Sequence, residues 1–291
     1  MKLNEINIRD PFILPYEGKY YMYGSRVRIT EACPKHWGEQ FGFDVYISED
    51  LENWSEPVCV FEKNPEFWGK EEFWAPEVHV YKGQFYMLAT FNAEGHCRGT
   101  HILRCDRPDG TFVPVSPVPA TPGDWECLDG TLYVDKKGKP HIVYCHEWLQ
   151  IGNGTVCEQE LSEDLTRTVS EPRVLWSALD YAQVRSVKKD RDAYVTDGPF
   201  LYRCGDGTLL CIWSSFDKNG YVELISRSNN GDIDGAWSVD DVALSGENGG
   251  HGMIFRDLEG NLRFTMHKPN SRTKERPVIL PLTESGSTLR L

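Results

Sequence analysis

Three aspartates and a histidine stand at matching places in a repeated sequence pattern. Asp10 lies in IRDPF, Asp129 in CLDGT, Asp197 in VTDGP and His251 in GGHGM, each just ahead of a strand-like apolar run. Carboxyl groups that are brought close together raise one another's pKa, so that one stays protonated while another is ionised. Such a pair can hydrolyse a glycosidic bond, because one carboxyl protonates the leaving oxygen and the other acts on water or on the sugar.

Five repeats carry these residues. They begin at Asp10, Ala75, Asp129, Asp197 and His251, and each contains a polar opening, an apolar strand, a tight turn and a second strand rich in aromatic or β-branched residues. A glycine stands in every turn, where it tolerates the positive φ of a hairpin connection. The turns are Glu17-Gly18, Lys82-Gly83, Lys137-Gly138, Asp206-Gly207 and Glu259-Gly260.

A second, more polar strand pair follows each hairpin, which makes four strands per repeat, the content of one propeller blade. The sequence therefore predicts an all-β fold, a five-bladed β-propeller with four-stranded antiparallel blades, and residues 1–291 as one domain. No segment has a sustained helical period, which disfavours an α/β fold. A β-sandwich is the alternative, but it does not account for five similar units.

The innermost strand of every propeller blade runs along the central channel, so we expect the repeat openings to meet at one end of it. This places Asp10, Asp129, Asp197 and His251 together, with Glu77 or the preceding Ala75-Pro76 from the second repeat. Any single Asp-Gly pair is more simply a turn residue. The inference depends on recurrence at the same point of the repeat.

Composition excludes several partners. The formal net charge of −13 and the absence of a basic run argue against nucleic acid. No apolar stretch is long enough to span a membrane, and residues 1–10 lack the apolar core of a signal peptide, so the chain as written is expected in the cytoplasm. A leader removed from the natural product is compatible with this.

Nine scattered cysteines without a Cys-x-x-Cys pair indicate neither disulfides nor a thiolate zinc site. The oligomeric state is not predicted.

The segments RDPF with GKYYMYGS, and FWAPEV with GQFYMLATF, resemble glycoside hydrolase family 43, and the likeness extends over the five repeats. The resemblance implies a five-bladed propeller that hydrolyses α-L-arabinofuranosides or β-D-xylosides with inversion. It also implies a base on the first blade, an aspartate that modulates the pKa of the acid on the third, and the acid on the fourth. Asp10 matches the base and Asp129 the modulator.

The fourth repeat departs from the pattern of that family. The acid there is usually a glutamate followed by a small residue and proline, whereas this chain has Asp197-Gly198-Pro199. Aspartate is one methylene shorter, and a displacement of about 1 Å can cost a hundredfold in rate. Three alternatives stay open: Asp197 is the acid for a differently seated substrate, Glu126 or Glu147 replaces it, or the site no longer cleaves. We favour the first.

Aromatic side chains near the repeat openings suit sugar recognition, because a sugar face stacks on a ring. Trp74 is the best candidate. The further candidates for substrate contact are Phe12, Glu77, Glu147, Trp148 and Arg276, with Arg9 and Arg26 as other donors to hydroxyls. The insert from Thr30 to Phe41 is a candidate for a segment that closes over the pocket, by its length and composition.

No cofactor is required by this chemistry. The family resemblance implies a calcium or sodium ion near His251, and a histidine whose nitrogens are satisfied by water is the equally good alternative.

We therefore expect a glycoside hydrolase that cleaves plant-type glycans with an inverting two-carboxylate mechanism, and an oligosaccharide or glycoside as its partner. Inversion requires the two carboxyls roughly 6.5 to 9.5 Å apart. The alternatives are a catalytically silent glycan-binding propeller, and a related propeller hydrolase that acts on another sugar such as a galactoside or a fructoside.

Overall fold

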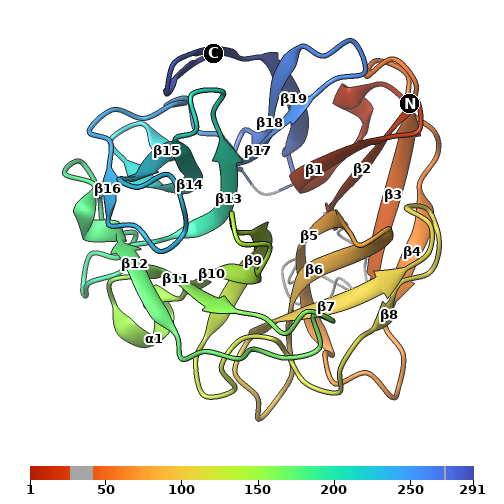
Figure 1. The fold of residues 1–291 in the computed structure, drawn as a ribbon, viewed down its shortest axis with the longest axis horizontal. Helices are drawn as coiled ribbons and strands as arrows, with labels where there is room; N and C mark the ends of the chain where they lie inside the picture. The colour runs from red at the N-terminus through yellow and green to blue at the C-terminus, as the bar shows by residue number, and fades with distance from the viewer. Residues whose placement is uncertain (27–41, 272) are drawn as a thin grey trace.

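The computed structural model describes residues 1–26, 42–271 and 273–291, and it forms the predicted propeller of five antiparallel sheets around one axis (Figure 1). The segment from Thr30 to Phe41, which the sequence suggested could close over the pocket, lies outside the described residues.

Strands follow one another outward from the axis in each blade. Blade one contains β1 (Ile8–Tyr16), β2 (Lys19–Arg26), β3 (Gly42–Ser48) and β4 (Val58–Glu62). Blade two contains β5 (Glu71–Tyr81), β6 (Gln84–Asn92), β7 (Gly99–Cys105) and β8 (Val113–Pro114). Blade three contains β9 (Cys127–Val134), β10 (Pro140–His146), β11 (Thr155–Glu160) and β12 (Arg173–Ser177). Blade four contains β13 (Asp197–Arg203), β14 (Leu209–Asp217), β15 (Gly220–Ser228) and β16 (Trp237–Val239).

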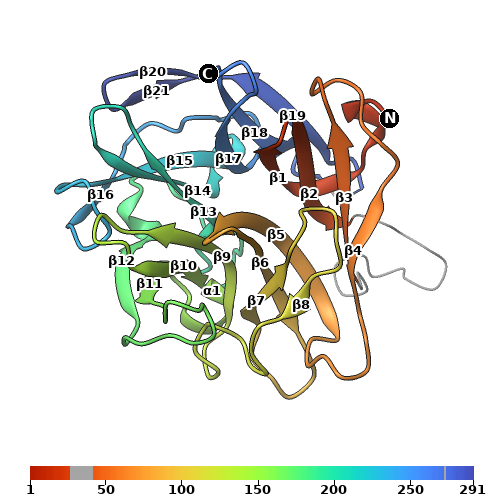
Figure 2. The same cartoon turned by 45° about the vertical axis from the view of Figure 1, so that its right-hand side comes forward.

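Blade five has three strands among the described residues, β17 (Gly250–Arg256), β18 (Leu262–Lys268) and β19 (Arg276–Pro281). The edge strand β19 carries Pro277 and Pro281, and proline is confined to such edges because it cannot donate to a ladder. The chain then leaves the sheet and forms a ribbon of β20 (Thr283–Ser285) and β21 (Thr288–Arg290) (Figure 2). Glu284 of this ribbon accepts the Gly205 N–H of blade four at 2.7 Å, so the ribbon bridges two blades.

Helices are short in the described part of the chain. They are η1 (Leu3–Glu5), α1 (Trp148–Ile151) and η2 (Ala178–Asp180). None of the helices among these residues is long and apolar enough to cross a membrane.

The innermost strand of every blade contains the same break in register. Two residues fall between the paired positions in β1, β5, β9, β13 and β17, and we call each such pair a start bulge. The five pairs are Asp10-Pro11, Ala75-Pro76, Asp129-Gly130, Gly198-Pro199 and His251-Gly252. The first residue of each has a φ between 44° and 55°, a left-handed conformation that is uncommon outside glycine. The second residue is always proline or glycine, so each start bulge can be recognised from its own two residues in the sequence.

Apolar side chains fill the spaces between blades, as the alternation within each strand dictates. Phe43 and Phe61 of blade one meet Phe73 and Phe91 of blade two, with ring centroids 4.9 to 6.2 Å apart. The same cluster extends to Phe255 of blade five. Because this cluster contains side chains of both blade one and blade five, it joins the first blade to the last and closes the ring.

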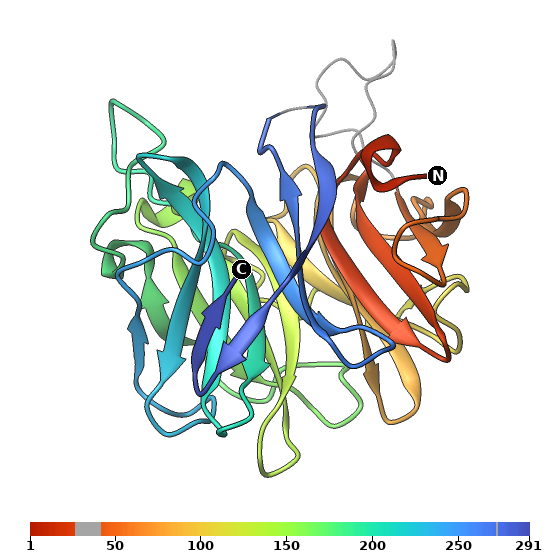
Figure 3. The same ribbon diagram turned by 90° about the horizontal axis from the view of Figure 1, so that it is seen from above.

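Hydrogen bonds add to this closure between the N-terminal segment and blade five. Asn7 donates to the Glu275 carbonyl at 2.7 Å, and Arg276 donates to the Asn4 carbonyl at 2.8 Å. Figure 3 shows η1 beside β19, where these bonds form. The start of the chain is therefore part of the ring.

Candidate active site

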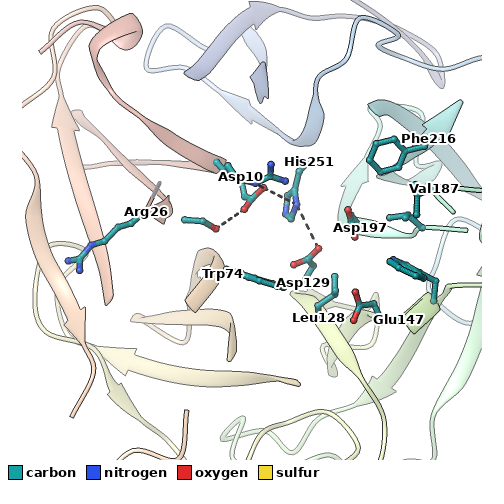
Figure 4. A pocket seen from close by; sticks show the side chains of 14 residues that line it. Asp10, Arg26, Trp74, Leu128, Asp129, Glu147, Val187, Asp197, Phe216 and His251 are labelled. Atoms are coloured by element: carbon teal, nitrogen blue, oxygen red, sulfur yellow. Dashed lines mark hydrogen bonds and ion pairs between the residues drawn. The ribbon is translucent and has the colours of Figure 1, made fainter. Parts of the chain in front are cut away.

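A cavity of about 400 Å³ opens at the end of the channel where the start bulges lie (Figure 4). Its lining includes the four acid–base residues of the repeat openings, Asp10, Asp129, Asp197 and His251. The structure thus brings together four side chains that are up to 241 positions apart between Asp10 and His251. Topology alone explains this, because each belongs to an innermost strand.

The start bulges set the direction of these side chains. Asp10, Asp129 and His251 each occupy the left-handed position, while in blade four Gly198 occupies it and Asp197 comes one residue earlier. Asp197 therefore corresponds in register to Trp74 and not to Asp10. A Cβ on Gly198 would lie 2.6 Å from the His251 ring, which explains the glycine at this position.

His251 lies between two carboxylates. Its Nδ1 is 3.2 Å from Asp10 Oδ1 and 3.7 Å from Asp129 Oδ2. Burial lowers the pKa of this imidazole, but Asp10, Asp129 and Asp197 outweigh burial and raise the pKa to about 9. The ring is therefore a cation at neutral pH.

Asp10 is held ionised. Burial raises the pKa of its carboxyl, but the charges of His251 and Arg9 outweigh burial and keep the pKa well below its usual range. Ser25 Oγ donates to Asp10 Oδ2 at 2.6 Å. His267 is neutral, since burial lowers its pKa to about 4, and its Nδ1 accepts the Asp10 backbone N–H at 3.3 Å.

Asp129 and Asp197 are less readily ionised. Burial, reinforced by Asp197 and Asp10, raises the pKa of Asp129 to about 7 against the opposing effect of His251. Its Oδ2 accepts the Gly198 N–H at 3.0 Å. Burial also raises the pKa of Asp197, while His251 and a hydrogen bond from the Tyr221 hydroxyl at 3.0 Å oppose this.

A fourth carboxyl, Glu147, lines the same cavity. It follows β10 directly and precedes α1, so its backbone is fixed between a strand and a helical turn. Arg98 donates to its Oε2 through Nη1 and to Glu72 Oε2 at 2.7 Å through Nε. Burial, reinforced by Asp197, raises the pKa of Glu147 to about 8 although Arg98 acts in the opposite direction.

Aromatic and apolar side chains form the remaining walls. Trp74 and Trp148 line the cavity as expected, together with Phe216. The Arg98 guanidinium lies 4.7 Å from the Trp74 ring. Arg191 lies 5.5 Å from the Trp148 ring, and Val187 lines the cavity. The insert between Leu179 and Ala193 therefore forms part of the pocket wall.

Three predicted substrate contacts lie elsewhere. Phe12 and Glu77 line a separate cavity of about 10 Å³, and Glu77 is 2.9 Å from His79. The left-handed position of blade two belongs to Ala75, so Glu77 is two residues further along the channel. Arg276 is outside the pocket lining and bonds to the Asn4 carbonyl at the ring closure. These placements do not support direct contact with a substrate in the main cavity.

Several residues that bond to the pocket carboxyls carry no signal in the repeat pattern. None lies in an innermost strand: Ser25 is in β2, His267 in β18, Tyr221 in β15, and Arg98 directly precedes β7. They meet the aspartates only because blades pack side by side. Glu126, one of the alternative acids, is not in the pocket lining and accepts the Arg98 backbone N–H at 3.1 Å.

The ion expected near His251 finds little support in the donor set. Among the described residues, no group of three His, Cys, Asp or Glu side chains is arranged to hold a metal. The Nδ1 of His251 is paired with Asp10 and Asp129, at 3.2 and 3.7 Å, and is not directed at an open site.

Known proteins resemble this chain over most of its length. The model of glycosyl hydrolases family 43 matches residues 4–283. A solved structure described as an endo-arabinase from Bacteroides thetaiotaomicron VPI-5482 is 37% identical, with a TM-score of 0.90 over 98% of this chain and 97% of that one.

Two curated proteins are more distant relatives. The extracellular exo-α-(1→5)-L-arabinofuranosidase ArbA of Cellvibrio japonicus is 22% identical over 89% of this chain and 73% of its own length. Xylosidase/arabinosidase 43A of Humicola insolens is 26% identical over 50% of this chain and 46% of its own.

Proposed function

Because this chain belongs to family 43 of the glycosyl hydrolases and is therefore a glycosidase, we propose that it releases or cuts α-L-arabinofuranosyl residues of plant-type glycans. The relatives support this choice over β-D-xylosides. The 37% identical structure is described as an endo-arabinase and the Cellvibrio protein as an arabinofuranosidase, and the Humicola protein, which matches half of the chain, is named for both xylosidase and arabinosidase activity.

The observation that carries the proposal is the buried, ionised carboxylate of Asp10 at the base of a pocket with aromatic walls. In an inverting reaction, Asp10 removes a proton from a water that attacks the anomeric carbon. A carboxyl on another wall protonates the leaving oxygen. Asp129, Asp197 and Glu147 are the carboxyls available there, and burial raises the pKa of each.

His251 and Arg9 position Asp10 for this role. The imidazolium at 3.2 Å and the Arg9 Nε at 3.8 Å restrain the carboxylate, and Ser25 orients its second oxygen. Trp74 and Trp148 supply apolar faces against which a sugar ring can stack, and they exclude water from the reacting atoms.

The proposal is tested by hydrolysis of 4-nitrophenyl α-L-arabinofuranoside, β-D-xylopyranoside, β-D-galactopyranoside and α-L-fucopyranoside by the wild type and Asp10→Asn. We expect turnover of the arabinofuranoside and a loss of kcat/KM by a factor of about 10² to 10⁴ in the variant. An unchanged circular dichroism spectrum would show that the variant is folded.

Other outcomes distinguish the alternatives. Full activity of Asp10→Asn would contradict the base assignment, and preferential xyloside turnover would contradict the substrate. Binding of arabino-oligosaccharides without cleavage of any glycoside would identify a catalytically silent propeller.

A further inference from the structure

The four pocket carboxyls are not equivalent with respect to His251. Asp10 and Asp129 lie 3.2 and 3.7 Å from the same Nδ1, so one imidazolium separates them. The imidazolium occupies the space between these two carboxyls, where an inverting reaction would need the sugar and the attacking water. Asp129 is therefore unsuited to protonate a leaving group on the face opposite to Asp10.

Asp197 is restrained on the pocket wall. Its position before the start bulge of blade four places it within a paired strand, and its short side chain receives a hydrogen bond from Tyr221 at 3.0 Å. Burial raises the pKa of this carboxyl, and His251, Tyr221 and Arg9 act in the opposite direction. Its short side chain and the bond from Tyr221 hold the carboxyl at the wall, so it is less able than a longer side chain to reach a leaving oxygen.

Glu147 has a different environment. It comes from the end of β10 on the wall that also carries Leu128 and Trp148, and Figure 4 shows its carboxyl across the pocket from Asp10. Its partner is Arg98 and not His251. The side chain is one methylene longer than that of Asp197, which extends the reach of its carboxyl.

The surroundings of Glu147 suit both the protonated carboxyl before proton transfer and the carboxylate that is left after it. Burial and the nearby carboxylates of Asp197, Glu72 and Asp129 favour the protonated form at neutral pH, with a pKa of about 8. Once the proton has left, Arg98 stabilises the carboxylate. Glu72 remains paired with Arg98 throughout, so the guanidinium keeps one counter-charge while Glu147 is neutral.

We propose that Glu147, and not Asp197, is the catalytic proton donor of this enzyme; this inference rests on the proposed function. The Glu147 proton passes to the glycosidic oxygen as the bond from that oxygen to the anomeric carbon breaks. Asp10 takes one proton from water, and the water oxygen bonds to the anomeric carbon. Exchange with solvent restores a protonated Glu147 and an ionised Asp10.

The test compares leaving groups. Glu147→Gln, Asp197→Asn and wild type are assayed on 2,4-dinitrophenyl α-L-arabinofuranoside, which needs little acid assistance, and on an α-1,5-arabino-oligosaccharide, which needs much. For Glu147→Gln we expect kcat to stay within about tenfold on the aryl substrate and to fall by about 10² to 10⁴ on the oligosaccharide. For Asp197→Asn we expect similar losses on both.

The pH profile gives a second readout. Wild-type kcat/KM on the oligosaccharide should fall as the pH rises above about 8, because Glu147 must be protonated to act. Glu147→Gln should lose this alkaline limb in its residual activity on the oligosaccharide, while Asp197→Asn keeps it. The Glu147 carboxyl is surrounded by Arg98, Asp197, Glu72 and Asp129. A substitution of any of these four would shift the pH at which activity falls, but the fall itself would remain.

Glu126→Gln is the matched control, since Glu126 lies in the neighbouring loop but outside the pocket lining, and its activity should equal that of the wild type. A leaving-group dependence in Asp197→Asn together with uniform losses in Glu147→Gln would overturn the inference and leave the proposed function intact. A wild type that cleaves neither arabinofuranoside would overturn both.

Discussion

Three buried histidines show how strongly the protonation of a residue depends on its neighbours. His251 faces carboxylates and has a pKa of about 9, whereas burial lowers the pKa of His267 and of His101 to about 4. The His101 ring lies among Phe67, Trp68 and Phe91. The residue type is the same in each case, and the charges around the ring decide its state.

The His101 environment predicts a pH dependence of stability. Nδ1 accepts the Trp68 indole N–H at 2.9 Å and Nε2 bonds to the Ser116 carbonyl at 3.1 Å, so protonation of Nδ1 would break the first bond. The folded pKa lies below the unfolded value, so the unfolded chain binds more protons between pH 6.5 and about 4. Stability is therefore lost as the pH falls through this range, by up to on the order of 3 kcal/mol.

Urea unfolding at several pH values measures this effect. His101→Gln should flatten the slope of the unfolding free energy between pH 6.5 and 4. His96→Gln, a change at an exposed histidine of the same blade, should leave the slope as in the wild type. An unchanged slope in His101→Gln would contradict the assignment.

At the scale of elements, the start bulge is the device that directs catalytic side chains. It occurs in all five innermost strands, and in blades one, three and five its first residue is Asp10, Asp129 or His251, each of which lines the pocket. Blade four departs from the others because Gly198 takes the left-handed position, which makes room for the His251 ring and displaces the carboxyl by one residue.

Gly198→Ala tests the role of this close approach. The added Cβ would meet His251 Cδ2 at 2.6 Å, so the ring must move away from Asp10 and Asp129. We expect a loss of stability of about 1 to 3 kcal/mol and a fall in kcat/KM of at least about tenfold. Thermal unfolding and the arabinofuranoside assay measure the two effects.

Gly207→Ala is the control for backbone strain alone. This glycine also has a positive φ, in the turn between β13 and β14, but a Cβ there would contact nothing within 4 Å. Its stability should fall by about 1 kcal/mol with no loss of activity. Equal activity losses in both variants would show that strain, and not the contact with His251, is responsible.

At the scale of the whole molecule, the ring depends on contacts between the two ends of the chain. Ile6 is 0% exposed and belongs to the cluster that reaches Phe255 of blade five. The bonds of Asn7 and Arg276 cross the same boundary. Blades one and five therefore stabilise each other, although they are distant in sequence.

Ile6→Ala should destabilise the protein by about 2 to 5 kcal/mol, since it leaves a cavity at this boundary. Unfolding should remain one transition when followed by both tryptophan fluorescence and circular dichroism. Val242→Ala, at a side chain that is 75% exposed, should change stability by less than about 0.5 kcal/mol. Two separate transitions would argue against a ring that unfolds as one unit.

The repeat pattern was sufficient to predict the propeller and the convergence of the acidic openings. Each hairpin is encoded by local features, namely strand alternation, a turn glycine, and the proline or glycine of the start bulge. Innermost strands must then meet at the channel, which follows from propeller geometry. Trp74, beside the second repeat opening, and Trp148, after β10, both line the pocket. The sequence does not distinguish Glu77 from Ala75-Pro76 as the second opening; in the structure Ala75 has the bulge position, and Glu77 lies two residues further along the channel.

The sequence by itself thus determined the architecture and the convergence of the repeat openings, because both depend on order along one strand at a time. Only the tertiary structure decided the protonation states, since these depend on distances between blades. The proximity of Arg98 to Glu147 and of Tyr221 to Asp197 joins residues that no local pattern relates. Buried carboxyls in a medium of low dielectric respond to such neighbours far more than to their own sequence context.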